Sequence, residues 1–283
     1  MPQPSIICFG EILWDCLPRG LFLGGAPFNV ACHLAQLGAD SHLVSTVGKD
    51  FLGDEALRRA EAHGVGLEYV LRDNELPTGT VIASLSDEGN ASYTFPTPVA
   101  WDEIHVGQCV LSAVKDVQAI VYGTLALRLH TNRERLESLL TPKGPMRCLD
   151  VNLREPYDDV ELALKLAAKA DLVKLNEIEL GRLTDSDPAD SVDGVASQCT
   201  KLKVIAGCQR ICVTRGAEGG VFWDNGEVHS AKSPPVEVKD TVGAGDAFMA
   251  ALIFGLISGQ PVAEALKAAC ARGAMIAGQD GAV

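Results

Sequence analysis

Asp240-Thr241-Val242-Gly243-Ala244-Gly245-Asp246 leads directly into the apolar run AFMAALIFGLI. The small residues at 243–245 allow a ligand to approach the backbone closely, and the apolar run predicts a helix over Ala244–Ile257. Backbone amides at a helix N-terminus favour an anion. Asp246, in the first turn, is either a surface acid that complements the helix dipole or a base beside a phosphoryl group. The stretch therefore predicts a phosphate site.

Short β-rich runs alternate with helical patterns on both sides of this stretch. The predicted strands are Ile6–Gly10, Leu43–Val47, Ala119–Tyr122, Arg147–Val151, Leu172–Lys174 and Arg210–Thr214. The predicted helices are Ala26–Leu37, Leu52–His63, Asn132–Leu140, Val160–Ala170, Ile178–Leu183, Val192–Ala206, Ala244–Ile257 and Val262–Ala277. This alternation is typical of an α/β protein with a mostly parallel central sheet flanked by helices. Ligands of such sheets bind beyond the carboxyl ends of the strands.

One segment interrupts the alternation. Thr80–Leu85 and Ser92–Phe95 have the pattern of two short strands around the turn Asp87-Glu88-Gly89-Asn90. A hairpin between two α/β units is a candidate lid over the active edge of the sheet. The alternative is an extra edge strand without a function.

Composition and charge exclude some classes of partner. The chain has 283 residues, and 24 Lys and Arg against 37 Asp and Glu leave a formal charge of −13. This excess of negative charge argues against a nucleic-acid polymer or an anionic membrane as the partner. A small phosphorylated ligand remains compatible, because backbone amides and a few cations can hold it.

The cysteine pattern and the absence of a targeting signal favour a reducing cellular compartment. The nine cysteines are scattered and form no C-x-x-C pair, which favours buried free thiols in a reducing compartment. We see no signal peptide, and the apolar run AFMAALIFGLI is too short to span a bilayer. We expect a soluble, cytoplasmic protein.

Several common catalytic motifs are missing from the sequence. There is no Walker motif and no G-x-G-x-x-G, so P-loop and NAD-dependent enzymes lose their main support. There is also no G-x-S-x-G or H-E-x-x-H, which weakens hydrolase and zinc-protease hypotheses.

Five motifs occur in order along the chain: G-G-A-P-F-N-V-A at 24–31, DVNLR at 150–154, NEIE at 176–179, TRGAEG at 214–219 and D-T-V-G-A-G-D at 240–246. Together they resemble the motifs of the ribokinase-like (PfkB) sugar kinase family. D-T-V-G-A-G-D at 240–246 matches the family's C-terminal signature D-T-x-G-A-G-D, and G-G-A-P-F-N-V-A at 24–31 resembles its first signature. DVNLR at 150–154, NEIE at 176–179 and TRGAEG at 214–219 resemble the elements between them. The resemblance implies a single kinase domain over 1–283, with a β lid contributed by approximately 12–24 and 79–98.

The resemblance also implies an ATP-dependent phosphotransferase that requires Mg²⁺. Asp246 is then the base for the sugar hydroxyl, and Gly243, Ala244 and Gly245 supply an anion hole. Asn176 and Glu179 serve the triphosphate, with Glu179 reaching Mg²⁺ through water. Without the resemblance, these two residues form a helix capping box, and both roles can coexist.

Other positions are assigned by the same resemblance. Thr214, Gly216 and Gly219 form the turn beneath the nucleotide, although a plain β-turn explains the pattern equally well without the other motifs. The residues implied at the sugar are Asp15, Gly25, Asn29, Asn152 and Arg154. Arg154 can steady a substrate or phosphate, or form an isolated surface ion pair.

Two details concern the metal and the adenine. The family's K⁺ loop would draw on Asp240 and the carbonyl of Val242. Cys270 stands where the family often has an adenine-facing Asn, so the adenine contacts differ here.

The absence of Lys and Arg from Gly79 to Ile104, across the predicted lid, favours a neutral sugar. Several segments most resemble bacterial fructokinase-like members, so we expect phosphorylation of the 6-hydroxyl of D-fructose. Alternatives are 2-keto-3-deoxygluconate, ribose or a nucleoside, or a catalytically silent sugar-binding relative. The lid hairpin exposes an unpaired strand edge, which predicts a homodimer.

Overall fold

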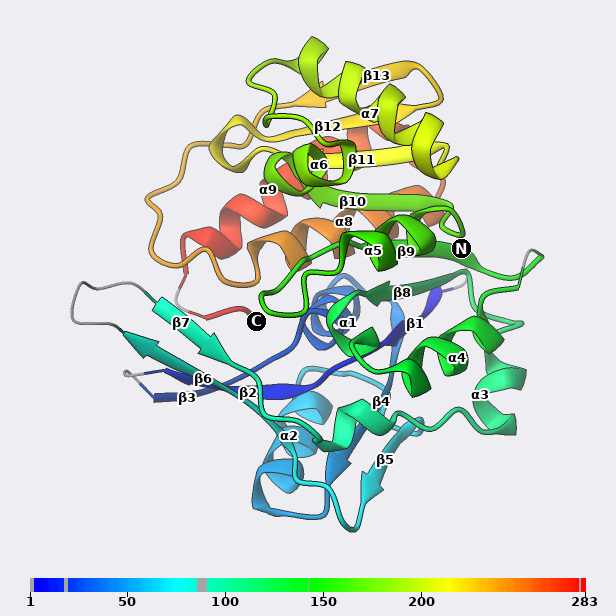
Figure 1. Cartoon of the computed structure of the whole chain (residues 1–283), viewed down its shortest axis with the longest axis vertical. Coiled ribbons are helices and arrows are strands. Elements are labelled where there is room, and N and C mark those ends of the chain that lie inside the picture. Colours follow the sequence, from blue (N-terminus) through cyan, green and yellow to red (C-terminus); the bar gives the residue numbers. More distant parts are fainter. Residues whose placement is uncertain (1–2, 18–19, 86–90, 142, 280) are drawn as a thin grey trace.

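The computed structural model describes residues 3–17, 20–85, 91–141, 143–279 and 281–283. Its centre is a nine-stranded sheet in the order β13-β12-β11-β10-β9-β8-β1-β4-β5 (Figure 1). The strands are β1 Ser5–Phe9, β4 Asp40–Gly48, β5 Val70–Asp73, β8 Ala119–Gly123, β9 Met146–Asp150, β10 Leu172–Asn176, β11 Arg210–Thr214, β12 Gly220–Asp224 and β13 Glu227–Ala231. Neighbouring strands are parallel from β5 to β11, and β12 and β13 are antiparallel additions.

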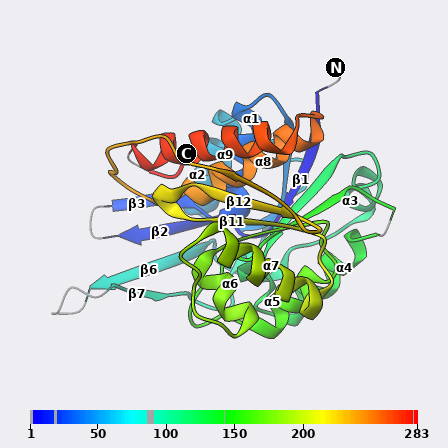
Figure 2. The ribbon, with the colours of Figure 1, turned by 90° about the horizontal axis from the view of Figure 1, so that it is seen from above.

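Helices cover both faces of this sheet (Figure 2). One face packs against α1 Ala26–Gln36, α2 Phe51–Ala62, α8 Ala244–Ile257 and α9 Val262–Ala277. The other face packs against α3 Gln108–Ala113, α4 His130–Leu139, α5 Val160–Ala167, α6 Glu177–Thr184 and α7 Val192–Ala206. Three short 3-10 turns are η1 Ala100–Glu103, η2 Leu125–Leu127 and η3 Gly216–Glu218. The predicted fold class is confirmed: an α/β fold with a mostly parallel, two-sided sheet.

A second sheet of four strands projects from one side of the main sheet (Figures 1 and 2). Its order is β3-β2-β6-β7, with β2 Leu13–Leu17, β3 Gly20–Gly24, β6 Gly79–Leu85 and β7 Ala91–Thr94. The predicted hairpin strands are therefore β6 and β7, and they extend this small sheet rather than an edge of the main one. The predicted turn at 87–90 lies outside the described residues.

The pairing register gives the small sheet two distinct faces. Asp15 pairs with Phe22 and Val81, whereas its neighbour Trp14 pairs with Leu23 and Thr80. Successive strand residues point to opposite faces, so Asp15 and Trp14 lie on different sides. Trp14 is buried, and its Nε1 donates to the carbonyl of Leu52 in α2. Trp14 thus anchors the start of β2 to the main body.

Within the described residues, no helix is both long and apolar enough to cross a bilayer. The described cysteines are free thiols, and all but Cys16 and Cys109 are buried.

Candidate active site

Parallel strands bring the predicted motifs to one edge of the main sheet. Glu11 follows β1, Asn152 and Arg154 follow β9, Asn176 ends β10, and Thr214 ends β11. The carboxyl ends of parallel strands meet at a common edge. The register of β10 and β11 places Asn176 directly beside Thr214.

Asp246 lies in the first turn of α8 and contacts Asn29 of α1. The Nδ2 atom of Asn29 donates to Oδ2 of Asp246 over 2.8 Å, across 217 residues of sequence. Burial, and next the negative charge of Asp150, raise the pKa of Asp246 to about 7, against the opposing effects of Lys174 and Asn29. A carboxyl group with this pKa exchanges protons readily near neutral pH.

The turn before Asp246 is shaped by Gly243. Its φ is 78°, a left-handed conformation that glycine adopts without strain. A Cβ at this position would lie 2.5 Å from Ala282, so Ala282 packs directly against the turn. The amide of Ala244 donates over 3.3 Å to the carbonyl of Thr241.

A buried ion pair, which the sequence analysis did not assign, lies beneath the same turn. The Nζ atom of Lys174 is 2.9 Å from Oδ2 of Asp150, and both residues are buried. A Cβ at Gly245 would lie 3.1 Å from the same Nζ, which places the ammonium group under the start of α8. In the sequence, Lys174 could have been recognised because it is a lysine inside the apolar strand LVKLN.

Glu11 is a second residue that the sequence analysis missed. Its Oε1 accepts from the amide of Ala26 over 3.2 Å and so caps α1, which lacks a cap of its own. Gly25, at φ 110°, permits this approach, because a Cβ there would lie 2.5 Å from the Glu11 carbonyl oxygen. Burial raises the pKa of Glu11 to about 7. In the sequence, Glu11 could have been recognised because it is an acidic residue just after a buried strand.

Two buried acceptor atoms near Asp246 have no hydrogen-bond partner among the described residues. They are Oε2 of Glu11 and Oδ1 of Asn29, and their residues are only 2% and 4% exposed. Because unpaired buried acceptors are costly, these oxygens suit a ligand that brings hydroxyl donors.

Asp15 and Arg154 complete this side of the site. Burial raises the pKa of Asp15 to about 6, and the charge of Arg154 opposes that rise. The same Arg154 charge also opposes the rise in the pKa values of Glu11 and Asp246, although its side chain is exposed. Asn152, at φ 40°, turns the chain between β9 and Arg154. The structure therefore places Arg154 within electrostatic reach of three carboxyl groups.

Asn176 and Glu179 form the predicted capping box. Oδ1 of Asn176 accepts from the amide of Glu179 over 2.8 Å, and Oε2 of Glu179 accepts from the amide of Asn176 over 2.9 Å. The other oxygen of Glu179 accepts from the amide of Leu153. Glu179 thereby ties the loop after β9 to the start of α6, and burial raises its pKa.

The remaining predicted positions lie in the turn after β11, in the segment before α8 and in α9. Thr214 leads into η3, which contains Gly216, and the amide of Arg215 donates to the carbonyl of Gly219 over 2.8 Å. Oδ1 of Asp240 accepts from the amide of Val242. In the ranges that the structure describes, no group of three or more His, Cys, Asp or Glu side chains could hold a metal. Cys270 is buried, and its thiol lies 3.5 Å from the carbonyl of Ala231.

Comparison with known proteins agrees with this geometry. The model for the pfkB family carbohydrate kinases matches residues 10–283. The fructokinase of Escherichia coli is 31% identical over 262 residues, covering 88% of this chain and 83% of that protein. The fructokinase of Klebsiella pneumoniae is 30% identical over 266 residues, covering 89% and 84%.

Solved structures give the same result. Fructokinase from Vibrio cholerae O395, in its fructose, ADP and calcium ion bound form, has a TM-score of 0.84 at 25% identity and covers 99% of this chain and 94% of that one. Aminoimidazole riboside kinase from Salmonella enterica, complexed with aminoimidazole riboside and an ATP analog, has a TM-score of 0.81 at 25% identity, covering 98% and 95%.

The ribokinase-like fold and these relatives define a phosphotransferase that uses an alcohol group as the acceptor. The chain belongs to the pfkB family of carbohydrate kinases, and it is a sugar kinase.

Proposed function

We propose that this sugar kinase transfers the γ-phosphoryl group of ATP to the 6-hydroxyl of D-fructose. The observation that carries the mechanism is Asp246, held by Asn29 at the start of α8 with its pKa raised to about 7. The 6-hydroxyl gives its proton to Asp246 as its oxygen bonds to the γ-phosphorus. The bond to the β–γ bridging oxygen breaks, and ADP leaves.

The sugar is held by acceptor groups around Asp246. Asp15, together with the unpartnered oxygens of Glu11 and Asn29, accepts hydrogen bonds from the sugar hydroxyls. Gly25 keeps the start of α1 close to this site, and Asn152 presents Arg154 at its rim. A site with several hydrogen-bond acceptors and one cation suits a neutral polyol, because its hydroxyl groups donate to the acceptors.

The transferred phosphoryl group meets the N-terminus of α8. The amides at Gly243, Ala244 and Gly245 stabilise its charge, and the dipole of α8 acts in the same direction. Lys174 lies beneath Gly245, so the ammonium group of its ion pair with Asp150 lies under the turn. This arrangement supplies electrostatic stabilisation, which is the main requirement of phosphoryl transfer.

The nucleotide occupies the ends of β10 and β11. Asn176 is exposed there beside Thr214, and Gly216 and Gly219 shape the turn beneath the base. Glu179 fits a hydrated Mg²⁺ through water, because both its oxygens already accept backbone amides. Mg²⁺ neutralises phosphate charge when bound. We assign K⁺ to Asp240 and the Val242 carbonyl.

We place the reaction in the cytoplasm, where the free thiols stay reduced. The small sheet acts as a lid over the sugar, since Asp15 reaches the site from β2.

Fructose is preferred because the relatives at about 30% identity are fructokinases and because no Lys or Arg occurs from 79 to 104. A second candidate is a ribose-containing substrate, since aminoimidazole riboside kinase has the same fold at 25% identity. A sugar acid such as 2-keto-3-deoxygluconate is favoured only by Arg154, whose charge reaches Asp15.

The test is coupled ADP release with Mg-ATP against fructose, ribose, 2-keto-3-deoxygluconate and adenosine. We expect turnover on fructose, and Asp246→Asn to lower it about 10²-fold or more, because the positioned base is lost. Asp187→Asn, at an exposed loop position, serves as the control and keeps full activity. Turnover only on another substrate would overturn the choice of sugar, and an active Asp246→Asn would overturn the base.

A further inference from the structure

His33 is a buried polar residue that the mechanism above does not use. It lies in α1 one turn after Asn29 and is fully buried. Residues four apart lie on the same face of a helix, so Asn29 and His33 face the same neighbours. Asn29 contacts Asp246, and His33 contacts residues near the end of the chain.

Both ring nitrogens of His33 have partners. Nε2 is 2.8 Å from the carbonyl oxygen of Ala282, and Nδ1 is 3.2 Å from Nη2 of Arg272. A carbonyl only accepts and a guanidinium only donates, so Nε2 carries the proton and Nδ1 accepts. Burial lowers the pKa of His33, in keeping with a neutral ring.

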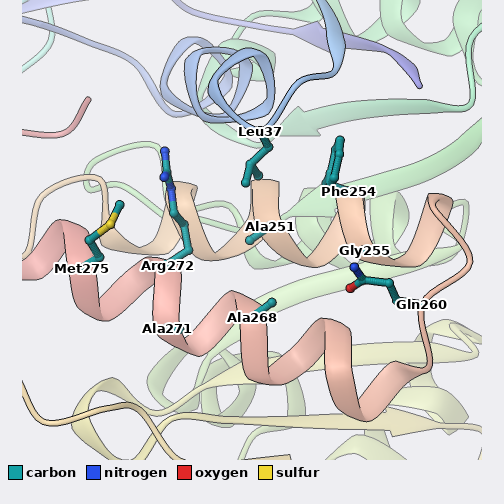
Figure 3. Close-up of a pocket in the computed structure, with 9 residues that line it drawn as sticks. All are labelled: Leu37, Ala251, Phe254, Gly255, Gln260, Ala268, Ala271, Arg272 and Met275. Atoms are coloured by element: carbon teal, nitrogen blue, oxygen red, sulfur yellow. The ribbon is translucent and has the colours of Figure 1, made fainter. Parts of the chain in front are cut away.

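Arg272, which contacts His33, also lines a groove. This groove, of about 410 Å³, lies between α1, α8 and α9, and Figure 3 shows Arg272 extending from α9 toward α1. Arg272 also donates to Gln36, the last residue of α1. The guanidinium contacts both His33 and Gln36 of α1, and these two contacts fix the orientation of the His33 ring.

Ala282, the acceptor of the His33 bond, packs on the turn that begins α8. A Cβ at Gly243 would lie 2.5 Å from Cα and Cβ of Ala282 and 2.6 Å from its carbonyl oxygen. Val283 packs against the core cluster that contains α1, α8 and α9. The chain around 282 is thus placed between His33 and Gly243, beside the start of α8 (Figure 1).

We propose that His33 is a positioning residue whose hydrogen bond to Ala282 holds residues 281–283 against Gly243 and so fixes the turn that presents the amides of α8. This role rests on the proposed use of those amides in phosphoryl transfer. His33 touches no substrate; it acts through Ala282 and Gly243. Its loss therefore affects the chemical step more than the binding of either substrate.

The kinetic test uses His33→Leu, a chain that ends at Gly281, and the two changes combined. We expect each single change to lower kcat about 10- to 100-fold, because small displacements of catalytic groups carry such costs. The KM values for ATP and sugar should change much less. The kcat of the combined variant should lie within about threefold of the kcat of either single variant, because both changes remove the same bond. If His33→Leu fails to fold, the chain ending at Gly281 tests the bond from its other partner.

The control is Cys32→Ala, which removes a buried side chain at the adjacent position of α1 and leaves the Ala282 bond intact. Hydrogen exchange of the peptide ending at Val283 should accelerate in His33→Leu and not in Cys32→Ala. This readout needs no sugar, so it tests His33 even if the parent phosphorylates none of the candidates. Unchanged exchange, a kcat within threefold of the parent, or effects that multiply in the combined variant would each overturn the proposal.

Discussion

At the scale of single residues, the site depends on carboxyl groups whose protonation is set by burial. Asp15, Glu11 and Asp246 all have raised pKa values, and burial is the largest cause for each. Lys174 stays charged in the same region because Asp150 pairs with it, and its pKa is raised although burial acts the other way. Desolvation thus makes these carboxylates stronger bases than they would be on the surface.

The raised pKa of Asp246 predicts the pH dependence of catalysis. The base acts only when unprotonated, so kcat/KM should fall about tenfold per pH unit below pH 7 and level off above it. The measurement is kcat/KM for the sugar from pH 5 to 9 at saturating Mg-ATP. A rate that stays constant down to pH 5 would contradict this assignment, because an ordinary aspartate would then be acting.

At the scale of elements, α1 organises the site. Its N-terminus is capped by Glu11 from the loop after β1, and one of its faces carries Asn29 and His33. The helix therefore connects the end of β1, Asp246 on α8 and Ala282. Its sequence pattern predicted the helix but none of these contacts.

Arg128 joins η1, η2 and the segment that follows β7. The Arg128 guanidinium makes two 2.7 Å bonds to Asp102 and one to the carbonyl of Pro96. It also stacks over Trp101 and Tyr157, with its carbon 4.0 and 4.8 Å from the ring centroids. Both charged side chains are fully buried.

Removing one partner of this pair should be strongly destabilising. Arg128→Met leaves the buried Asp102 carboxylate unpaired, and we expect the free energy of unfolding to fall by about 3–5 kcal/mol. Arg128→Met combined with Asp102→Asn should recover much of this loss. Urea unfolding measures both, with Arg58→Met as the control, since the exposed Arg58–Glu55 pair contributes little to stability. Equal losses for Arg128→Met and Arg58→Met would refute the argument.

The elements also show where the sequence pattern was insufficient. β5, α3, β12 and β13 were not predicted. The hairpin β12–β13 had a clear signal, because Asn225-Gly226 lies between two β-rich runs and both residues have positive φ. β5 and α3 have only four and six residues, too few for periodicity to indicate a structure.

At the scale of the whole molecule, the small sheet has an exposed apolar face. Cys16 pairs with Leu21 on one side and Ile82 on the other, so the three share a face, opposite that of Asp15. Leu21 and Ile82 are 42% and 44% exposed. An apolar sheet face that reaches solvent suits association with a second copy of the chain.

We predict a homodimer that buries this face. Light scattering at micromolar concentration should give twice the 29.9 kDa of one chain. Ile82→Asp should give the monomer mass, since a charge would be desolvated at the contact. Val204→Asp, on α7 and 83% exposed, is the matched control and should leave the mass unchanged. A monomeric parent protein would rule out the dimer.

The sequence by itself determined the α/β class, the order of the main strands and helices, and the family. These properties are local: hydrophobic periodicity marks each element, and short glycine and carboxylate motifs mark the strand ends that carry chemistry. Because parallel strands end at one edge, even the gathering of those motifs was predictable.

Only the tertiary structure decided how the site residues act on one another. Asn29 meets Asp246 across 217 residues, and His33 meets Ala282 across 249. The cap that Glu11 gives to α1, the Lys174–Asp150 pair and the raised pKa of Asp246 likewise depend on which distant groups share a buried volume. Desolvation and Coulomb interactions depend on distance and burial in space, which no local pattern of residues records.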